Sequence, residues 1–215
     1  GDGGIVTTND EELATRMRKF GSLGYRAMKA NEGRIRLDKS VFQDPSYKRH
    51  DTKGLNYRMP EVAAAVGLAQ TERFEEFVDR RTALGQMMTQ AIAGSKILIP
   101  QKSIKGSRNT HWTFAARLIN PEIKWQDFRS KFIHFGGESI FGCWALTYDE
   151  PLVSEGNYKK HNPVLYNDLN FPHGICPNAE EIQPQLMLFP TNYETLEEGR
   201  IQAEALYNTI KFYEN

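Results

Sequence analysis

The chain has 215 residues, and its 27 Lys and Arg residues are matched by 27 Asp and Glu residues. A chain of this length buries roughly 70% of its unfolded surface, which is enough for one large domain or two small ones. The balanced charge creates no global field that would attract nucleic acid or an anionic membrane, so we expect neither as a partner.

Cysteine content and hydropathy narrow the class of protein further. Cys143 and Cys176 form neither a C-x-x-C pair nor a Cys/His metal spacing, so we expect no metal site. One disulfide between them is open, but the pattern favours two separate buried thiols in a cytosolic protein. The sequence has no apolar run of membrane-spanning length, and its N-terminus lacks a signal-peptide pattern. We therefore expect a soluble protein of the cytoplasm.

The first 53 residues predict a turn, a strand, a helix and a long loop. The turn covers residues 1–4 and the strand residues 5–8, and Asn9 caps a helix that Gly21 ends. Acidic residues in the first turn and basic residues in the last turn suit the helix dipole. Residues 22–53 are irregular and polar, with an excess of Lys and Arg that is either solvated or meets a phosphate or carboxylate.

Residues 54–68, GLNYRMPEVAAAVGL, combine a polar loop with an apolar helix. Pro60 suits a first helical position, because an N–H at that position has no partner within the helix. The helix has no polar face and small side chains, which predicts a buried helix that another backbone approaches closely. The loop would present Asn56, Tyr57 and Arg58 to a ligand, although the same residues also fit an ordinary helix cap and an ion pair.

The rest of the chain predicts a second long helix and then a small α/β domain. The helix covers residues 72–93, with apolar side chains at helical spacing and Gly94 at its end. After it, short strands alternate with helices. The last helix begins with a capping box of Thr195 and Glu198. The remaining elements are strands over 96–100, 111–119 and 139–141, a helix over 125–135, and a loop over 154–175 whose structure the sequence does not define.

Four segments, in this order, resemble motifs of one enzyme family. Residues 1–10 are similar to G-[DE]-G-G-x-x-x-T-x-[ND], and residues 54–70 resemble G-x-N-Y-R-M-x-E-x-x-A-A-x-G-x-x-Q. Residues 111–114 resemble H-x-[WFY]-x-x, and residues 176–190 resemble C-P-x-A-E-x-I followed by L-P-x, with Pro184 expected to shorten or bend that helix. The chain is identified as a member of the DegT/DnrJ/StrS-type sugar aminotransferases, which use pyridoxal 5'-phosphate (PLP) and have the aspartate-aminotransferase fold.

The resemblance implies an α/β chain, the C-terminal part of a PLP-dependent transferase of fold type I. Residues 1–58 correspond to the end of the large PLP-binding domain with an insertion loop. Residues 59–94 correspond to connector helices, and residues 95–215 to the small C-terminal α/β domain. The lysine that forms the Schiff base with PLP is expected just before Gly1. We therefore assign no catalytic residue within this chain and expect the chain to be inactive alone.

The resemblance also assigns roles to residues of the polar loop. It implies that Asn56 donates a hydrogen bond to the PLP phosphate across a dimer interface. Tyr57 and Arg58 would support this contact and face the substrate. His111, in contrast, is expected to be an ordinary buried histidine and neither a ligand nor a base.

A second group of candidate residues follows the strand predicted at 139–141. Residues 142–153 take the place of the family's Y-P-x-P-L-H loop, which approaches the substrate. Trp144 and Tyr148 supply the aromatic side chains there, and we expect both to contact the substrate. Val153 stands where the family has a histidine, so the sequence does not identify the sugar.

The implied reaction of the complete enzyme is transfer of an amino group, from glutamate, to a keto group of a sugar, typically nucleotide-linked. The expected partners are the keto-sugar, the amino donor, and either a second copy of the chain or the N-terminal portion of the same enzyme. Two alternatives stay open. One is a non-catalytic half-chain that only pairs or dimerises, and the other is a PLP-dependent sugar dehydratase in which histidine replaces the lysine. A relative with an iron–sulfur cluster needs four thiolates, and two cysteines argue against it.

Overall fold

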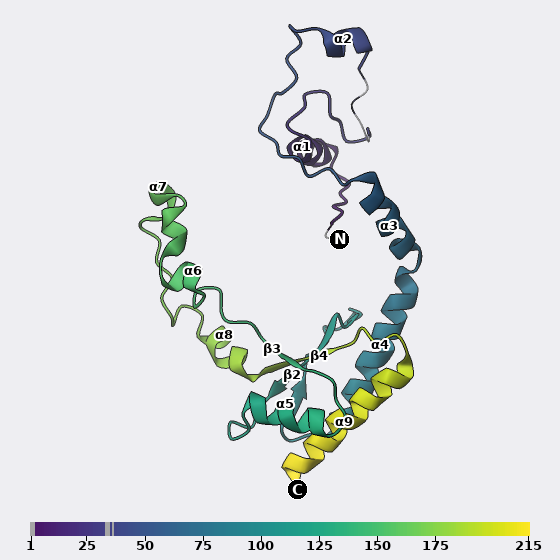
Figure 1. Cartoon of the computed structure of the whole chain (residues 1–215), viewed down its shortest axis with the longest axis vertical. Helices are drawn as coiled ribbons and strands as arrows, with labels where there is room; N and C mark the ends of the chain where they lie inside the picture. Colours follow the sequence, from purple (N-terminus) through teal and green to yellow (C-terminus); the bar gives the residue numbers. More distant parts are fainter. Residues whose placement is uncertain (1–2, 33–34, 36) are drawn as a thin grey trace. The chain divides into compact units, whose positions relative to one another are not determined.

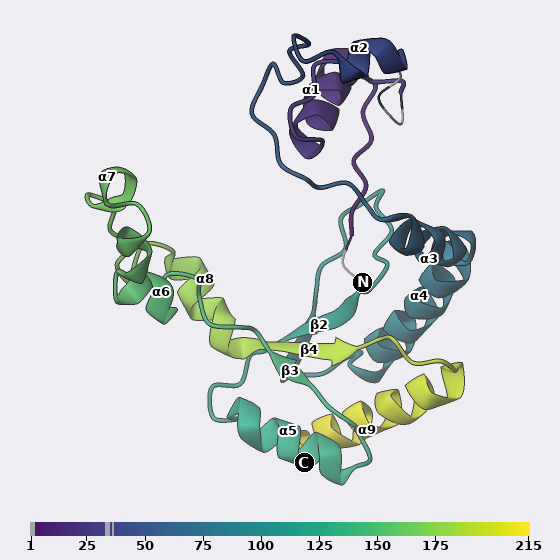
Figure 2. The ribbon, with the colours of Figure 1, turned by 45° about the horizontal axis from the view of Figure 1, so that its top comes forward.

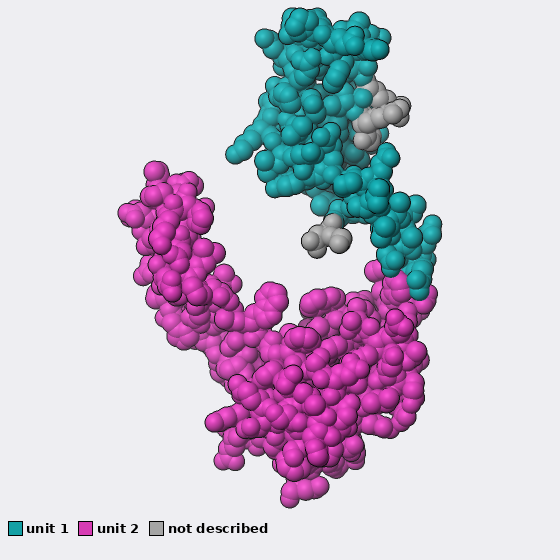
Figure 3. Space-filling model, viewed as in Figure 1, with its two compact units in different colours: residues 1–73 teal, residues 74–215 magenta. Residues whose placement is uncertain are grey.

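The computed structural model describes residues 3–32, 35 and 37–215. The chain divides into two compact units, residues 1–73 and residues 74–215, which Figure 3 shows in different colours. The boundary falls inside the region 59–94 that the sequence assigned to connector helices, close to the start predicted for the second of them, residue 72. Helices and short strands are both present, as the predicted α/β class requires (Figure 1).

Unit 1 begins with an irregular segment and helix α1, Glu11–Gly21. Asp10 is the N-cap, and not Asn9 as predicted, since the Asp10 carboxylate accepts a hydrogen bond from the backbone N–H of Leu13 at 2.9 Å. The helix includes Gly21, and Ser22 is its C-cap. The predicted strand over 5–8 is wrong, because a strand needs a neighbour and the described part of unit 1 contains only two isolated bridges.

The loop over 22–53 is irregular as predicted, except for the short helix α2, Lys39–Gln43. Two charged residues of the loop, Arg49 and Asp51, have structural partners. Arg49 donates to the Phe42 carbonyl at 2.7 Å, and Lys19 of α1 reaches Asp51 at 2.7 Å. Gly1 and Asp2 of the predicted motif, and Arg34 and Arg36 of the predicted cationic set, lie outside the described residues.

Helix α3, Glu61–Glu72, differs most from its prediction. Pro60 is its N-cap and not its first residue. The apolar pattern predicted a buried helix, yet every residue of α3 except Ala63 is exposed. Val62 is 78% exposed and Val66 is 60% exposed. The sequence therefore predicted the helix but not its surroundings, because nothing in the described part of unit 1 covers its apolar surface.

Unit 2 is built on an antiparallel sheet whose strand order, among the described residues, is β1-β2-β4-β3. Neighbouring strands are paired along registers such as Phe114 with Phe189 and Arg117 with Leu186. The strands predicted over 96–100 and 111–119 are present but shorter, the one predicted over 139–141 lies at 141–142, and β4 was not predicted. The bounds are β1, Leu98–Pro100; β2, Thr113–Leu118; β3, Phe141–Gly142; and β4, Leu186–Pro190.

Three helices cover one face of this sheet: α4, Phe74–Ala91; α5, Trp125–His134; and α9, Leu196–Glu214 (Figure 2). Buried and partly exposed side chains alternate along β2 and β4, as expected for strands with one packed face. The core between sheet and helices includes Phe114, Phe128, Phe132, Phe189 and Leu206, each at most 2% exposed. Burial of these large side chains supplies most of the driving force for folding this unit.

The end of unit 2 agrees closely with its sequence pattern. Thr195 and Glu198 form the predicted capping box of α9, with hydrogen bonds of 3.0 and 3.2 Å. Helix α8 ends before Pro184, as expected from the missing proline N–H. Residues 154–175 are not a plain loop, because they include two short helices. The elements between β3 and β4 are α6, Pro151–Ser154; η1, Asn157–Lys160; α7, Pro163–Tyr166; α8, Pro177–Ile182; and η2, Gln183–Gln185.

Cys143 and Cys176 are free thiols, and both are exposed. The prediction of two separate thiols is confirmed, and the prediction that they are buried is wrong. Both residues lie in irregular parts of the chain between β3 and β4, Cys143 directly after β3 and Cys176 directly before α8.

Candidate functional site

The loop that carries Asn56 is fastened to the C-terminal end of α1 by backbone hydrogen bonds. Leu55 N–H donates to the Phe20 carbonyl at 2.6 Å, and Tyr57 N–H donates to the Gly21 carbonyl at 2.9 Å. Asn56 itself forms an antiparallel bridge with Ser22. These contacts fix the backbone on both sides of Asn56, so its side chain leaves the loop from a rigid position.

Two glycines make this close approach possible, and sequence reasoning missed their role. A Cβ at Gly54 would lie 2.2 Å from the backbone nitrogen of Gly24, and Gly24 has a φ of +72°. Gly54 was recognised only as the first residue of a motif. Its partner could not be inferred, since Gly24 lies in the long loop that gave no residue-level signal.

The three candidate residues of this loop lie together. The Arg58 Nε–H donates to the Asn56 Oδ1 at 2.9 Å, and the Asn56 amide nitrogen has no partner among the described residues. Tyr57 is 69% exposed, and its ring lies 6.0 Å from the Phe20 ring. The loop therefore offers an amide donor beside a guanidinium, which is a donor set suited to a phosphate or carboxylate.

Arg58 also lines a hollow in unit 1 of about 820 Å³. Among the described residues, the charged side chains in its wall are Arg18, Lys39 and Arg58, and Tyr25 also lines it. A cavity whose charged groups are all cations attracts anions. The structure thus gives the polar loop an electropositive surrounding within its own unit.

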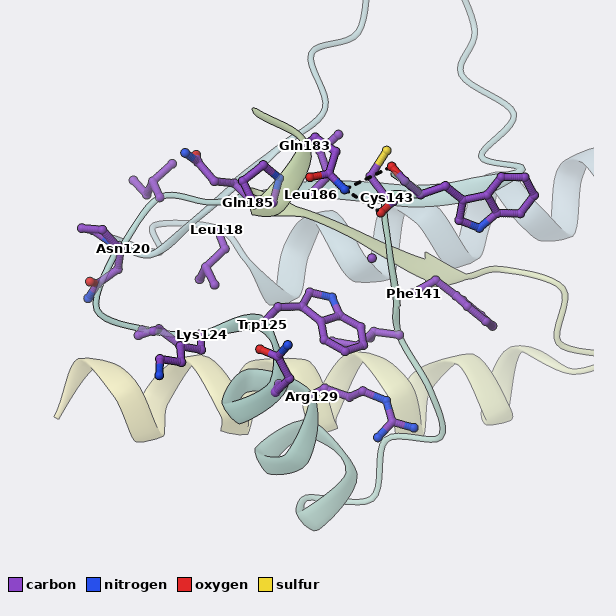
Figure 4. A pocket seen from close by; sticks show the side chains of 18 of the residues that line it. Leu118, Asn120, Lys124, Trp125, Arg129, Phe141, Cys143, Gln183, Gln185 and Leu186 are labelled. Atoms are coloured by element: carbon purple, nitrogen blue, oxygen red, sulfur yellow. Dashed lines mark hydrogen bonds between the residues drawn. The ribbon is translucent and has the colours of Figure 1, made fainter. Parts of the chain in front are cut away.

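In unit 2, Trp144 and Tyr148 lie on the irregular segment after β3. Trp144 is 86% exposed, so its indole is presented to solvent. The Gln183 amide donates to the carbonyls of Cys143 and Trp144, both at 3.1 Å, drawn as dashed lines in Figure 4. Cys143, Trp144 and Gln183 border a cavity of about 890 Å³ between the sheet and α5. Its wall also contains Trp125, whose buried indole N–H has no partner among the described residues.

Tyr148 is held by its hydroxyl group. It donates to Glu180 Oε1 at 2.7 Å, and the Gly174 N–H donates to the same oxygen at 2.7 Å. Loss of solvation and the adjacent Glu180 raise the pKa of the Tyr148 phenol, so it stays protonated. The hydrogen bond from Tyr148 in turn lowers the pKa of Glu180. The Tyr148 hydroxyl is thus occupied by its hydrogen bond to Glu180, so only the ring of Tyr148 is available to contact a substrate.

His173 completes this group of side chains. Its ring lies between Asp149, at 3.1 Å, and Glu180, at 3.3 Å. The hydrogen bond to Asp149 and the charge of Glu180 raise the pKa of His173. Sequence reasoning missed Glu180, His173 and Gln183 as site residues. The C-P-x-A-E-x-I motif contained a signal for Glu180, but its contact with Tyr148 spans a loop that the sequence did not order.

His111 precedes β2 and is half-buried, although it was expected to be buried. Its φ is +48°, and its carbonyl accepts a hydrogen bond from the Thr191 hydroxyl. The ring lies against α4, where a Cβ at Gly85 would come within 2.3 Å of it. Burial lowers the pKa of His111, and its Nδ1 has no partner among the described residues. These contacts are those of a residue that packs a strand against a helix.

No group of three or more His, Cys, Asp and Glu residues among the described residues is arranged to hold a metal ion. No helix in the described part of the chain is both long and apolar enough to cross a membrane.

Two curated enzymes are similar to parts of this chain. One is GDP-perosamine synthase from Caulobacter vibrioides, 31% identical over 121 residues, which are 55% of this chain and 28% of that enzyme. The other is UDP-4-amino-4-deoxy-L-arabinose–oxoglutarate aminotransferase from Shewanella sediminis, 38% identical over 85 residues, or 39% of this chain and 20% of that enzyme. The matched segment thus spans about a quarter of the length of these relatives.

The structure resembles that of an aminotransferase from Psychrobacter cryohalolentis, with a TM-score of 0.70 and 20% identity, over 97% of this chain and 51% of that one. The fold is therefore that of PLP-dependent transferases of fold type I, of which this chain spans about half. Residues 1–203 match the DegT/DnrJ/EryC1/StrS aminotransferase family, and the chain belongs to that family.

Proposed function

We propose that this chain is the C-terminal part of an enzyme that transfers an amino group from glutamate to the keto group of a nucleotide-linked sugar. The observation that carries this proposal is the family match over residues 1–203. The names of two similar enzymes support the substrate class, because each contains a nucleotide-linked amino sugar. One of them also names oxoglutarate, the keto acid that glutamate becomes when it gives up its amino group.

The family implies PLP, and the polar loop of unit 1 fits its phosphate group. Asn56 has amide hydrogens without a partner among the described residues, and Arg58 places a guanidinium beside them. Such donors hold a phosphate in a fixed orientation. When bound, PLP supplies the electron sink through which an amino group leaves one carbon and joins another. We assign Asn56 and Arg58 to holding the phosphate, and Tyr57 to the adjacent wall.

The segment after β3 is proposed to face the sugar. Trp144 offers an exposed flat apolar surface, and the ring of Tyr148 lies five positions before Val153 at the same edge of unit 2. Aromatic rings pack well against the apolar face of a sugar and leave its hydroxyl groups to other donors. The absence of the family's histidine at Val153 suggests that this enzyme orients its sugar differently.

The active unit is proposed to be a homodimer in which Asn56 serves the phosphate of the partner subunit. The open apolar surface of α3 supports this, since patches of this kind on soluble proteins usually contact another protein. The chain spans about half of the similar solved structure, so we expect activity only with the remaining part of the enzyme.

The experiment is a transfer assay with the complete enzyme, PLP and ¹⁵N-labelled glutamate. Keto-sugars linked to GDP, UDP or dTDP are supplied one at a time, and products are analysed by mass spectrometry. Aminotransfer predicts a sugar product that carries one ¹⁵N, together with one 2-oxoglutarate for each sugar. A sugar product that has lost water and carries no label would overturn the proposal in favour of the dehydratase. If neither product forms with any keto-sugar, the half-chain alternative is supported.

A further inference from the structure

Residues 176–185 hold residues 143–148 at two separate points. The Gln183 amide donates to the carbonyls of Cys143 and Trp144, at the beginning of that segment. Glu180 accepts a hydrogen bond from Tyr148 at its end. Both contacts therefore come from one short stretch, α8 and η2, which belongs to the C-P-x-A-E-x-I motif.

This short stretch is itself anchored to the sheet. Arg117, in β2, reaches Glu181 Oε1 at 2.7 Å and donates from Nε to Gln185 Oε1 at 2.6 Å. Arg117 is paired with Leu186 of β4 in the sheet register. Residues 176–185 thus have a fixed position relative to the core of unit 2. Their hydrogen bonds to residues 143–148 therefore fix that segment relative to the same core.

Residues 143–148, in contrast, have little structure of their own. They are irregular and end in a turn in which Asp149 N–H donates to the Leu146 carbonyl at 2.8 Å. Trp144 is 86% exposed, so packing does not determine where its indole points. Its orientation depends on its backbone, and the backbone depends on the contacts at either end.

We propose that Glu180 and Gln183 are positioning residues that orient Trp144 toward the sugar. This rests on the proposed function, because it assigns to these residues the sugar selectivity of the same site. Neither residue touches the substrate in this proposal. Each fixes one end of residues 143–148, so that the backbone of Trp144, and with it the region its indole can reach, is set before the sugar arrives, which lowers the entropy lost on binding.

His173 makes one of the two contacts dependent on pH. The titratable groups that face this cluster are Asp149 and Glu180 beside the imidazole, Tyr148, whose ring lies edge-on to it at 6.3 Å, and Cys176 near Tyr148. The pKa of His173 is raised, so protonation strengthens its bridge between Asp149 and Glu180. The stabilisation is complete below the ordinary histidine pKa and is lost as the pH rises through the raised value. The hold on Tyr148 therefore weakens with rising pH.

The test is ¹⁹F NMR of the complete enzyme labelled with 5-fluorotryptophan, with the Trp144 resonance assigned through Trp144→Phe. Gln183→Met removes the two amide donors at similar length, and Glu180→Met removes the carboxylate that Tyr148 binds. Either change is expected to shift and narrow the Trp144 resonance. Glu180→Gln restores an acceptor for Tyr148, so it should recover the wild-type resonance but lose its pH dependence between about pH 6 and about pH 8.

Glu122→Gln is the matched control, because Glu122 is exposed and its side chain has no partner among the described residues. It should leave the Trp144 resonance unchanged. A folded Glu180→Met or Gln183→Met protein with the wild-type Trp144 resonance would overturn the proposal. This readout needs no substrate, so it stands or fails independently of the proposed reaction.

The functional part is tested by steady-state kinetics on the same proteins. Loss of either contact should raise KM for the keto-sugar by about tenfold, as expected for one lost hydrogen bond, while kcat changes much less. KM for glutamate should stay the same, which a general loss of structure would not allow. A displaced Trp144 resonance with unchanged KM for the sugar would show that Trp144 does not meet the substrate and would overturn the proposal.

Discussion

The Arg58 Nε–H donates to the oxygen of the Asn56 side chain at 2.9 Å, which turns that oxygen toward Arg58 and leaves the amide nitrogen to donate to a ligand. The amide hydrogens then have no partner among the described residues, on a backbone that is bonded to the end of α1. An arrangement of this kind favours an anionic oxygen over a neutral one, because the neighbouring guanidinium adds its charge to the same site.

Replacement of Asn56 should weaken PLP binding. Asn56→Ala removes one hydrogen bond to a charged group, which costs about 1.5–3 kcal/mol and lowers PLP affinity by at least tenfold. Asn56→Asp should be worse, since it places a negative charge beside the phosphate. The measurement is retention of PLP absorbance in the complete enzyme during dialysis. Asn167→Ala, at an exposed position in unit 2, serves as the control, and equal PLP affinity in all four proteins would refute the assignment of Asn56.

Gly54→Ala should unfold the polar loop. The new Cβ would lie 2.2 Å from the backbone nitrogen of Gly24 and 2.9 Å from the Lys19 carbonyl oxygen, and backbone atoms cannot rotate away. We expect a loss of stability of about 1–3 kcal/mol and a loss of PLP retention at the same time. Asn208→Ala is the control, since Asn208 is exposed in the middle of α9 and alanine is favoured in a helix. Urea unfolding of both variants measures the difference, and equal midpoints would contradict the prediction.

The elements that could be predicted from the sequence are those with local causes. The capping box at Thr195 and the end of α8 before Pro184 depend on residues within one turn of the helix. The strand expected over 5–8 failed because a strand also requires a neighbour, and its sequence contains no information about one. The burial of α3 failed for the same reason, since an apolar helix indicates that a cover exists but does not say which chain supplies it.

In the candidate site, too, contacts between residues close in sequence could be predicted and long-range contacts could not. Asn56, Tyr57 and Arg58 are consecutive, so their proximity followed from the sequence alone. The contact between Tyr148 and Glu180 joins residues 32 positions apart, through a loop without periodicity. Long-range side-chain contacts of this kind depend on where the whole unit places two segments. The motif at residues 176–190 identified the segment, but it did not predict that this segment forms hydrogen bonds with residues 143–148.

Acid should destabilise unit 2 through His111. Burial lowers the pKa of His111 in the folded state, so the unfolded chain binds its proton more readily. Stability is therefore highest above the ordinary histidine pKa of about 6.5 and falls as the pH drops toward the folded value. Urea midpoints at about pH 7 and about pH 5 measure this fall. The change His111→Asn, which tolerates the positive φ, should make the fall smaller.

His173 opposes the effect of His111, because its raised pKa makes the folded state more stable at low pH. The comparison is therefore made in a protein from which His173 has been removed. In a His173→Gln background, the fall in stability between the two pH values should be larger than in the wild type. An identical fall with and without His111 would show that other groups cause the acid sensitivity.

The last prediction concerns assembly through α3. Val62, Val66 and Leu68 are between 60% and 78% exposed, and the alanines between them allow another backbone to approach closely. We expect the complete enzyme to be a homodimer in which this helix is covered. Ala64→Glu places a charge in the middle of that surface and should shift the protein to monomers at micromolar concentration, with PLP retention falling in parallel. Asn208→Glu, on an exposed position of α9, is the matched control and should leave the dimer intact. Light scattering across a dilution series measures both. A monodisperse monomer that Ala64→Glu does not change would show that α3 is covered within its own chain.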